Sequence, residues 1–176
     1  MTSKLERKIK KVKLLILDVD GVLTNGEIVL DERGKEIKTF DVRDGYGLVL
    51  LQRAGYKTAI LSARSAGAVT ARAKDLKITK VCQNASPKLK VYQRLLKEMK
   101  LKDEQVCFIG DDLPDLAVLR RVGFSVSVPN GASEVRSVVD YVTKREGGDG
   151  AVREIVEMIL KVNRKWQGIL KGCGAG

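Results

Sequence analysis

LLILDVDGVLTNG (residues 14–26) opens with four branched apolar residues and then places Asp18 and Asp20 one residue apart. A short, continuous apolar run is typical of a strand that is covered on both faces, as in a parallel sheet. Such a strand holds the residues that follow it at a fixed point on the sheet edge. We therefore interpret this stretch as a buried strand that carries two carboxylates to a surface.

Segments with strand-like and helix-like patterns alternate along the rest of the chain. Further strands are predicted within residues 56–62, 79–83, 105–111, 124–128 and 140–143. Helical spacing follows in residues 46–55, 65–76, 86–100, 113–123 and 150–166, and Asp44 is the expected N-cap of the first of these helices. This alternation indicates parallel βαβ units. The predicted fold class is therefore α/β, with a doubly wound, mostly parallel sheet.

One segment, residues 26–42, breaks the alternation. Two short strand-like runs flank the turn sequence DERGK, which indicates a β-hairpin inserted after the first strand. We find no larger insertion that would form a cap over the sheet, and no interdomain linker. The expected organisation is a single domain over residues 1–170, followed by a flexible tail over residues 171–176.

Composition limits the classes of function that remain. The 176 residues are 44% hydrophobic and 31% charged, which suits a soluble globular domain. No apolar run approaches the length of a membrane span. The basic N-terminus leads into a short apolar run that ends in Asp18 and Asp20, without the small residues of a cleavage site, so we expect a cytoplasmic protein.

Histidine is absent, which excludes histidine-based hydrolases, histidine-nucleophile phosphatases and most zinc enzymes. Cys82, Cys107 and Cys173 are too scattered to indicate a disulfide framework or a zinc site. The net charge is +11, but only 5% of the residues are aromatic and none lies in a basic stripe. We interpret the charge as a solvated lysine-rich surface and expect no nucleic acid or membrane partner.

Polar residues collect where the predicted strands end, which is where open α/β sheets bind their ligands. These residues are Asp18, Asp20, Ser62, Arg64, Asp111, Asp112 and Asp115, together with Lys88 at the start of a helix. Crowded carboxylates repel one another unless a cation joins them, and hard oxygen ligands suit Mg²⁺. A hydroxyl and two cations beside that metal can surround a phosphoryl group. One carboxylate can accept this group as an aspartyl-phosphate while its neighbour transfers the proton.

These motifs resemble those of a known enzyme superfamily. DVDGVLT (18–24), Ser62 at a strand end, Lys88 and GDDLPD (110–115) are similar, in order and spacing, to the four motifs of the haloacid dehalogenase superfamily of phosphatases. TFDVRDGYG (39–47), residues 61–76 and GGDGAVREIVEMIL (147–160) extend the resemblance to the capless 3-deoxy-D-manno-octulosonate 8-phosphate (KDO 8-phosphate) phosphatases. It implies a hydrolase of KDO 8-phosphate, in lipopolysaccharide sugar biosynthesis, and a homotetramer whose subunits pack through the hairpin.

The resemblance also implies a role for each site residue. Asp18 is the expected nucleophile, and Asp20 the general acid and base. Asp18, the backbone carbonyl of Asp20, and Asp111 are the expected Mg²⁺ ligands, supported by Asp112 and Asp115. Ser62 and Lys88 are expected to bind phosphate. Arg64, Arg43 and Arg72 are the candidates for binding the sugar acid.

The chain departs from the family where Ala63 replaces the usual glycine, and at most positions between Gln83 and Lys88. Several alternatives stay open: a phosphatase for a related nine-carbon sugar acid, a broad small-molecule phosphatase, a phospho-receiver signalling domain, or a nucleic-acid binder. Arg43 and Asp44 are equally well explained as a loop ion pair with a cap, and Arg72 as a residue on a helix face.

Overall fold

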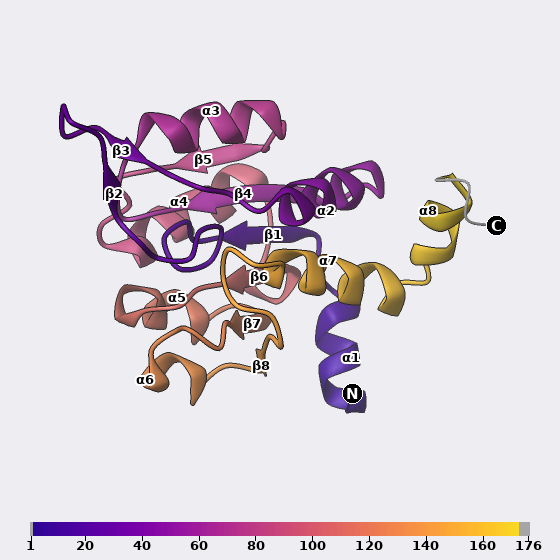
Figure 1. The fold of residues 1–176 in the computed structure, drawn as a ribbon. Coiled ribbons are helices and arrows are strands. Elements are labelled where there is room, and N and C mark those ends of the chain that lie inside the picture. The colour runs from indigo at the N-terminus through magenta and orange to yellow at the C-terminus, as the bar shows by residue number, and fades with distance from the viewer. Residues whose placement is uncertain (1, 173–176) are drawn as a thin grey trace.

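A parallel sheet forms the centre of the computed structural model, which describes residues 2–172 (Figure 1). Its six strands lie in the order β5–β4–β1–β6–β7–β8, and every neighbouring pair is parallel. The strands are β1 (Leu14–Leu17), β4 (Lys57–Leu61), β5 (Lys80–Cys82), β6 (Val106–Ile109), β7 (Phe124–Ser127) and β8 (Tyr141–Val142). Each lies inside a predicted segment, and the doubly wound α/β prediction is confirmed.

Helices cover both faces of the sheet. One core lies under α1 (Ser3–Lys10), α2 (Val42–Arg53), α3 (Gly67–Asp75) and α7 (Ala151–Val162), and the other under α4 (Lys88–Met99), α5 (Leu116–Leu119) and α6 (Ser133–Arg136). Successive side chains of β1 alternate between them: Leu15 and Leu17 join the first core, whereas Leu14 and Ile16 join the second. All four are fully buried. Strand β1 is therefore a rigid mount for the residues that follow it.

The chain order reverses between β1 and β6. From β1 the sheet continues through β4 to β5 in one direction, and from β6 through β7 to β8 in the other. The helices that follow β1 and β6 therefore leave in opposite directions, which opens a crevice at the carboxyl ends of these two strands. Asp18 directly follows β1, and Gly110 and Asp111 follow β6.

The hairpin predicted within residues 26–42 is present. Strands β2 (Val29–Leu30) and β3 (Glu36–Ile37) pair antiparallel in a separate sheet that stands at the carboxyl end of the large sheet (Figure 1). The Asp31 carboxylate accepts hydrogen bonds from the backbone N–H groups of Arg33 and Lys35, which closes the turn. Ile28 and Leu30 are both 58% exposed, so the hairpin presents apolar surface to solvent.

The N-terminal helix was not predicted, and the C-terminal helix differs from its prediction. Ser3–Lys10 forms helix α1, which buries Ile9 in the core near α7. The single helix predicted over residues 150–166 is wrong: α7 ends at Val162, and Arg164 adopts a left-handed φ of +57° before α8 (Trp166–Gly172) begins. Residues 171 and 172 of the predicted tail belong to α8, and residues 173–176 lie outside the described part of the chain. No helix within residues 2–172 is long and apolar enough to cross a membrane.

Helix α2 begins one turn earlier than expected, and its N-cap is Asp41 instead of Asp44. The Asp41 carboxylate accepts hydrogen bonds from the N–H groups of Arg43 and Asp44. Asp44 itself is buried, and its Oδ1 accepts a 2.7 Å hydrogen bond from the N–H of Arg153 in the first turn of α7. Gly150, at the N-cap of α7, has no side chain to offer there. Asp44 therefore joins the N-termini of two helices.

Burial raises the pKa of Asp44 to about 6, whereas an unfolded aspartate titrates near 3.9. The unfolded chain thus loses this proton at a lower pH than the folded protein does. The free energy of unfolding therefore falls as the pH rises from about 4 to about 6. We expect Asp44→Asn to keep the hydrogen bond from the N–H of Arg153. Its free energy of unfolding, relative to that of the parent protein, should rise by up to about 3 kcal/mol from pH 4 to pH 7. Urea unfolding at both pH values measures this difference, and a difference that does not change with pH would contradict it.

Candidate active site

The loop after β1 places two aspartates at a cavity of about 290 Å³. Asp18, Asp20, Ser62, Arg64, Lys88, Asp111, Asp112 and Asp115 all line this cavity, so the sequence-predicted cluster is brought together in space. The Thr24 hydroxyl lies within 3.4 Å of the N–H groups of Gly21 and Gly26 and of the carbonyl of Val19. Thr24 therefore closes the loop that carries Asp18 and Asp20.

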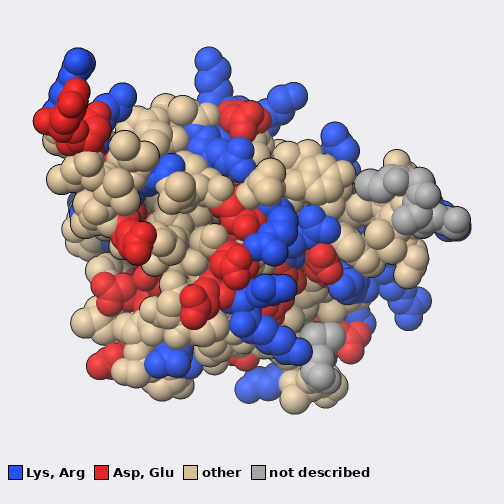
Figure 2. Space-filling view, viewed as in Figure 1, with Lys and Arg blue, Asp and Glu red and all other residues tan. Residues whose placement is uncertain are grey.

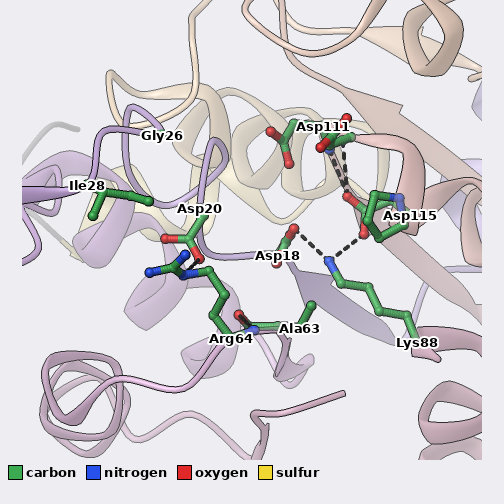
Figure 3. A pocket seen from close by; sticks show the side chains of 12 residues that line it. Asp18, Asp20, Gly26, Ile28, Ala63, Arg64, Lys88, Asp111 and Asp115 are labelled. Carbon is green, nitrogen blue, oxygen red and sulfur yellow. Dashed lines mark hydrogen bonds and ion pairs between the residues drawn. The ribbon is translucent and has the colours of Figure 1, made fainter. Parts of the chain in front are cut away.

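Lys88 links two of the buried carboxylates. Its Nζ donates hydrogen bonds of 2.6 Å to Oδ2 of Asp18 and to Oδ1 of Asp115 (Figure 3). The Lys88 side chain is only 2% exposed, and that of Asp115 is fully buried. The two carboxylates outweigh the cost of burial and raise the pKa of Lys88 above its ordinary value, so this residue is a fixed cation at the wall of the cavity.

Asp115 organises the loop after β6. Its Oδ2 accepts hydrogen bonds from the N–H groups of Asp111 (3.0 Å) and Asp112 (3.3 Å), while its Oδ1 is bound to Lys88. A Cβ at Gly110 would lie 2.7 Å from the Asp115 side chain, so only glycine fits there without a shift. Both oxygens of Asp115 are thus engaged in holding other residues of the site in place.

Asp111 carries an unsatisfied oxygen. Its Oδ1 is buried without any hydrogen-bond partner among the described residues. Carboxylate oxygens of Asp18, Asp111 and Asp115 lie within 4.8 Å of one another. Burial, together with these neighbours, raises the pKa of Asp111 to about 8 and that of Asp18 to about 7. A divalent cation between Asp18 and Asp111 would satisfy the free oxygen and relieve the repulsion, so this set of hard oxygen donors fits Mg²⁺.

Ser62 and Arg64 approach the cavity from the end of β4. Ser62 is buried, and its Oγ accepts a 3.2 Å hydrogen bond from the N–H of Arg64. The Arg64 side chain is 48% exposed and turns toward Asp20, with 3.7 Å between its Nε and Oδ2 of Asp20 (Figure 3). The site therefore joins a hydroxyl, a buried ammonium and a guanidinium to the acidic cluster.

The other two candidate arginines do not line this cavity. Arg43, on α2, binds Asp41 at the N-cap of that helix and Asp149 in the loop before α7. Arg72, on α3, pairs with Asp75 and lies over the ring of Phe40. Within one chain, the structure thus separates both residues from the acidic cluster and favours the helix-face interpretation of Arg72.

Several residues that support the site were not identified from the sequence. Gly21 has a φ of +84°, and a Cβ there would lie 2.0 Å from Oδ2 of Asp111. Asn130 accepts a hydrogen bond from the N–H of Gly147, which in turn packs directly on the carbonyl of Gly21. The position of Gly21 directly after the Asp-x-Asp pair is the sequence feature that could have identified it. Nothing in the local pattern singles out Asn130.

Gly21→Ala and Gly34→Ala form a matched pair, because both glycines have positive φ but only Gly21 faces another residue within 4 Å. Each substitution should cost about 1–2 kcal/mol of folding stability through the backbone. We expect only Gly21→Ala to weaken Mg²⁺ binding, by about tenfold or more, since it displaces Asp111. Isothermal titration with Mg²⁺ measures this, and equal affinities of the two variants would contradict the role of Gly21.

Figure 2 shows Lys and Arg side chains interspersed with Asp and Glu on the face it displays, without a continuous basic band. Several surface lysines are paired with acids, among them Lys8 with Asp140 and Lys11 with Glu104. This arrangement agrees with the interpretation of the charge as a solvated surface.

Comparison with known proteins identifies relatives along most of the chain. Residues 77–155 match the model of the haloacid dehalogenase-like hydrolases. The chain is 42% identical, over 157 residues, to the 3-deoxy-D-manno-octulosonate 8-phosphate phosphatase KdsC of Yersinia pestis, which covers 89% of this chain and 84% of that protein. The same enzyme of Escherichia coli strain K12 is 40% identical over 158 residues, or 90% of this chain and 84% of that protein.

Solved structures agree with these relatives. The KDO 8-phosphate phosphatase of Moraxella catarrhalis, in complex with magnesium, phosphate and KDO, superposes with a TM-score of 0.93 at 41% identity, covering 97% of this chain and 99% of that one. The cobalt-bound enzyme of Haemophilus influenzae gives a TM-score of 0.87 at 37% identity, covering 90% and 92%. With its fold, its acidic cluster and these matches, the chain belongs to the KDO 8-phosphate phosphatase family of haloacid dehalogenase-like hydrolases.

Proposed function

We propose that this protein hydrolyses the phosphomonoester of KDO 8-phosphate, an eight-carbon sugar-acid phosphate, with Mg²⁺ as cofactor. One observation carries the proposal: a buried carboxylate, Asp18, lies between a fixed cation, Lys88, and a second carboxylate, Asp111, that has an unpartnered oxygen. This arrangement provides a nucleophile, a charge for the phosphoryl group and a set of ligands for a metal ion.

The reaction proceeds in two displacements at phosphorus. First, a carboxylate oxygen of Asp18 forms a bond to phosphorus while the bond from phosphorus to the sugar oxygen breaks, and Asp20 gives its proton to that oxygen. Asp20 then takes a proton from water, whose oxygen attacks phosphorus and releases phosphate and the free Asp18 carboxylate. Mg²⁺, held by Asp18, Asp111 and the backbone carbonyl of Asp20, supplies positive charge to the transferring group.

Other residues bind and orient the substrate. The ammonium of Lys88 and the hydroxyl of Ser62 contact the phosphoryl oxygens, because both groups are buried at the cavity wall. Arg64, half-exposed at the mouth of the cavity, meets the sugar-acid carboxylate. Asp115 keeps Lys88 and the backbone of Asp111 in place, and Asp112 caps the short 3₁₀ helix Leu113–Asp115 beside them. Arg43 and Arg72 are left out of this substrate set.

Phosphate release from a panel of sugar-acid phosphates tests the substrate. The panel contains KDO 8-phosphate, a nine-carbon 2-keto-3-deoxy sugar-acid phosphate and simple phosphomonoesters, each assayed with Mg²⁺ and with a chelator. We expect kcat/KM to be highest for KDO 8-phosphate and activity to disappear without Mg²⁺. A higher value for the nine-carbon acid would replace the proposed substrate, and a uniform response would indicate a broad phosphatase.

Asp18→Asn keeps the shape of the side chain but removes the nucleophilic charge. We expect kcat to fall below about one thousandth of the parent value, because no acyl-phosphate can form at an amide oxygen. Phosphate release measures the loss, and thermal unfolding verifies that the variant is folded. Near-parental turnover by folded Asp18→Asn would remove Asp18 from the nucleophile's role.

The assembly and location belong to the same proposal. We propose a cytoplasmic homotetramer that packs through the hairpin, and a single working domain over residues 1–170. The exposed apolar side chains Ile28, Val29, Leu30 and Ile37 support the hairpin as a contact surface, since a monomer would leave them in water. A neighbouring subunit seated there would also help to cover the open cavity.

Leu30→Glu tests the assembly, with Val138→Glu as the control, because Val138 is also exposed but lies between α6 and β8, which are apart from the hairpin in Figure 1. Light scattering should give a tetramer for the parent and for Val138→Glu. We expect Leu30→Glu to yield smaller species, since a charge at each contact opposes burial. A monomeric parent, or an intact Leu30→Glu tetramer, would contradict packing through the hairpin.

A further inference from the structure

A second ionic cluster lies beside the first and comes from the hairpin. Lys38 follows β3, and its Nζ donates hydrogen bonds to Oδ1 of Asp20 and, at 2.7 Å, to Oε1 of Glu36. The Lys38 side chain is 2% exposed, and that of Glu36 is 13% exposed. The ammonium is thus enclosed between two carboxylates, one of which is the proposed acid and base.

Arg64 closes this cluster into a ring. Its guanidinium donates a 3.2 Å hydrogen bond to Oε2 of Glu36 and lies 3.7 Å from Oδ2 of Asp20. Each oxygen of Asp20 therefore faces a different cation, Lys38 on one side and Arg64 on the other, and Glu36 holds both cations. With two charged contacts, the carboxylate is fixed in orientation as well as in position.

The two cations have different access to the cavity. Arg64 lines it, but Lys38 and Glu36 do not. The Lys38 side chain is also almost completely buried, so a substrate in the cavity meets Arg64 and Asp20 and does not meet the Lys38 ammonium. A lysine that is bound to the proton-transfer residue without access to the substrate acts on the reaction through that residue alone.

We propose that Lys38, held by Glu36, is a positioning residue that fixes the Asp20 carboxylate for both proton transfers. The proposal rests on the role of Asp20 in the proposed function. Because Lys38 and Glu36 belong to the β3 arm, the hairpin supplies part of the acid–base apparatus as well as an exposed surface. The β3 arm thus contacts the proposed proton-transfer group, whereas Asp18 and Asp111 follow strands of the large sheet and Lys88 begins α4.

The test compares Lys38→Met and Lys38→Arg with Lys35→Met, which makes the same change of charge at an exposed position of the same hairpin. The parent is first shown to hydrolyse KDO 8-phosphate, so that a failure of the proposed function is recognised separately. We expect Lys38→Met to lower kcat about 100-fold with KM within about threefold, because proton transfer is impaired and binding is not. Lys38→Arg should recover most of this loss, and Lys35→Met should match the parent.

A second substrate separates positioning from a general defect. p-Nitrophenyl phosphate has a leaving group that needs no proton, so phosphoryl transfer to Asp18 stays fast, while release of phosphate still needs Asp20. Lys38→Met should therefore show a stoichiometric burst of p-nitrophenolate followed by slow turnover. A variant that is merely damaged loses burst and turnover together.

Glu36→Gln gives an independent measurement if Lys38→Met unfolds, because the amide keeps its shape and weakens its hold on Lys38. We expect this variant to lower kcat about tenfold with an unchanged KM and to show the same burst. A kcat within threefold of the parent value, in folded Lys38→Met or Glu36→Gln, would overturn the proposal. So would a rise in KM with unchanged kcat in either variant, or a burst of p-nitrophenolate that falls in proportion to turnover.

Discussion

Crowding of buried negative charge at the end of β1 is the constraint on which this structure depends. Asp18, Asp111 and Asp115 offer carboxylate oxygens within 4.8 Å of one another, and Lys88 is bound to two of them. When all are ionised, three carboxylates and one ammonium leave two negative charges in a poorly hydrated place, and burial makes such an excess costly. A divalent cation would offset that charge, and the proposed phosphate-binding role of Lys88 fits its place beside the same carboxylates.

The fold provides what this cluster needs. Strand β1 is buried on both faces and lies at the point where the strand order reverses, so it brings Asp18 next to the loop that carries Asp111. Glycine stands where an aspartate side chain comes too close for a Cβ, at Gly21 beside Asp111 and at Gly110 beside Asp115. In place of a cap domain, the hairpin covers one side and brings Lys38 and Glu36 to Asp20. One strand therefore mounts Asp18, the proposed nucleophile, and a separate arm contacts Asp20, the proposed proton-transfer residue.

The sequence was sufficient to predict the sheet and the acidic cluster, because Asp18 and Asp111 each end a continuous apolar run. Lys88 was identified by its position relative to the two acidic motifs, at the start of a helix. A role for Lys38 and Glu36 was not predicted, because Asp20 and Arg64, which they contact, come from other segments of the chain. The alternation of apolar and polar residues in the hairpin gives no sign that a charged side chain is buried there. Arg43 was assigned by resemblance, and the structure pairs it with Asp41 and Asp149. The break between α7 and α8 depends on a left-handed Arg164, for which the sequence offers no glycine.

The acyl-phosphate on Asp18 is the most direct test of this account. Enzyme mixed with Mg²⁺ and substrate is quenched during turnover and treated with borohydride, which reduces an aspartyl-phosphate to homoserine, and the peptide that contains residue 18 is then sequenced by mass spectrometry. We expect homoserine at position 18 only when substrate and Mg²⁺ are both present. Rapid turnover with an unmodified Asp18, or with the label on another residue, would contradict the central claim.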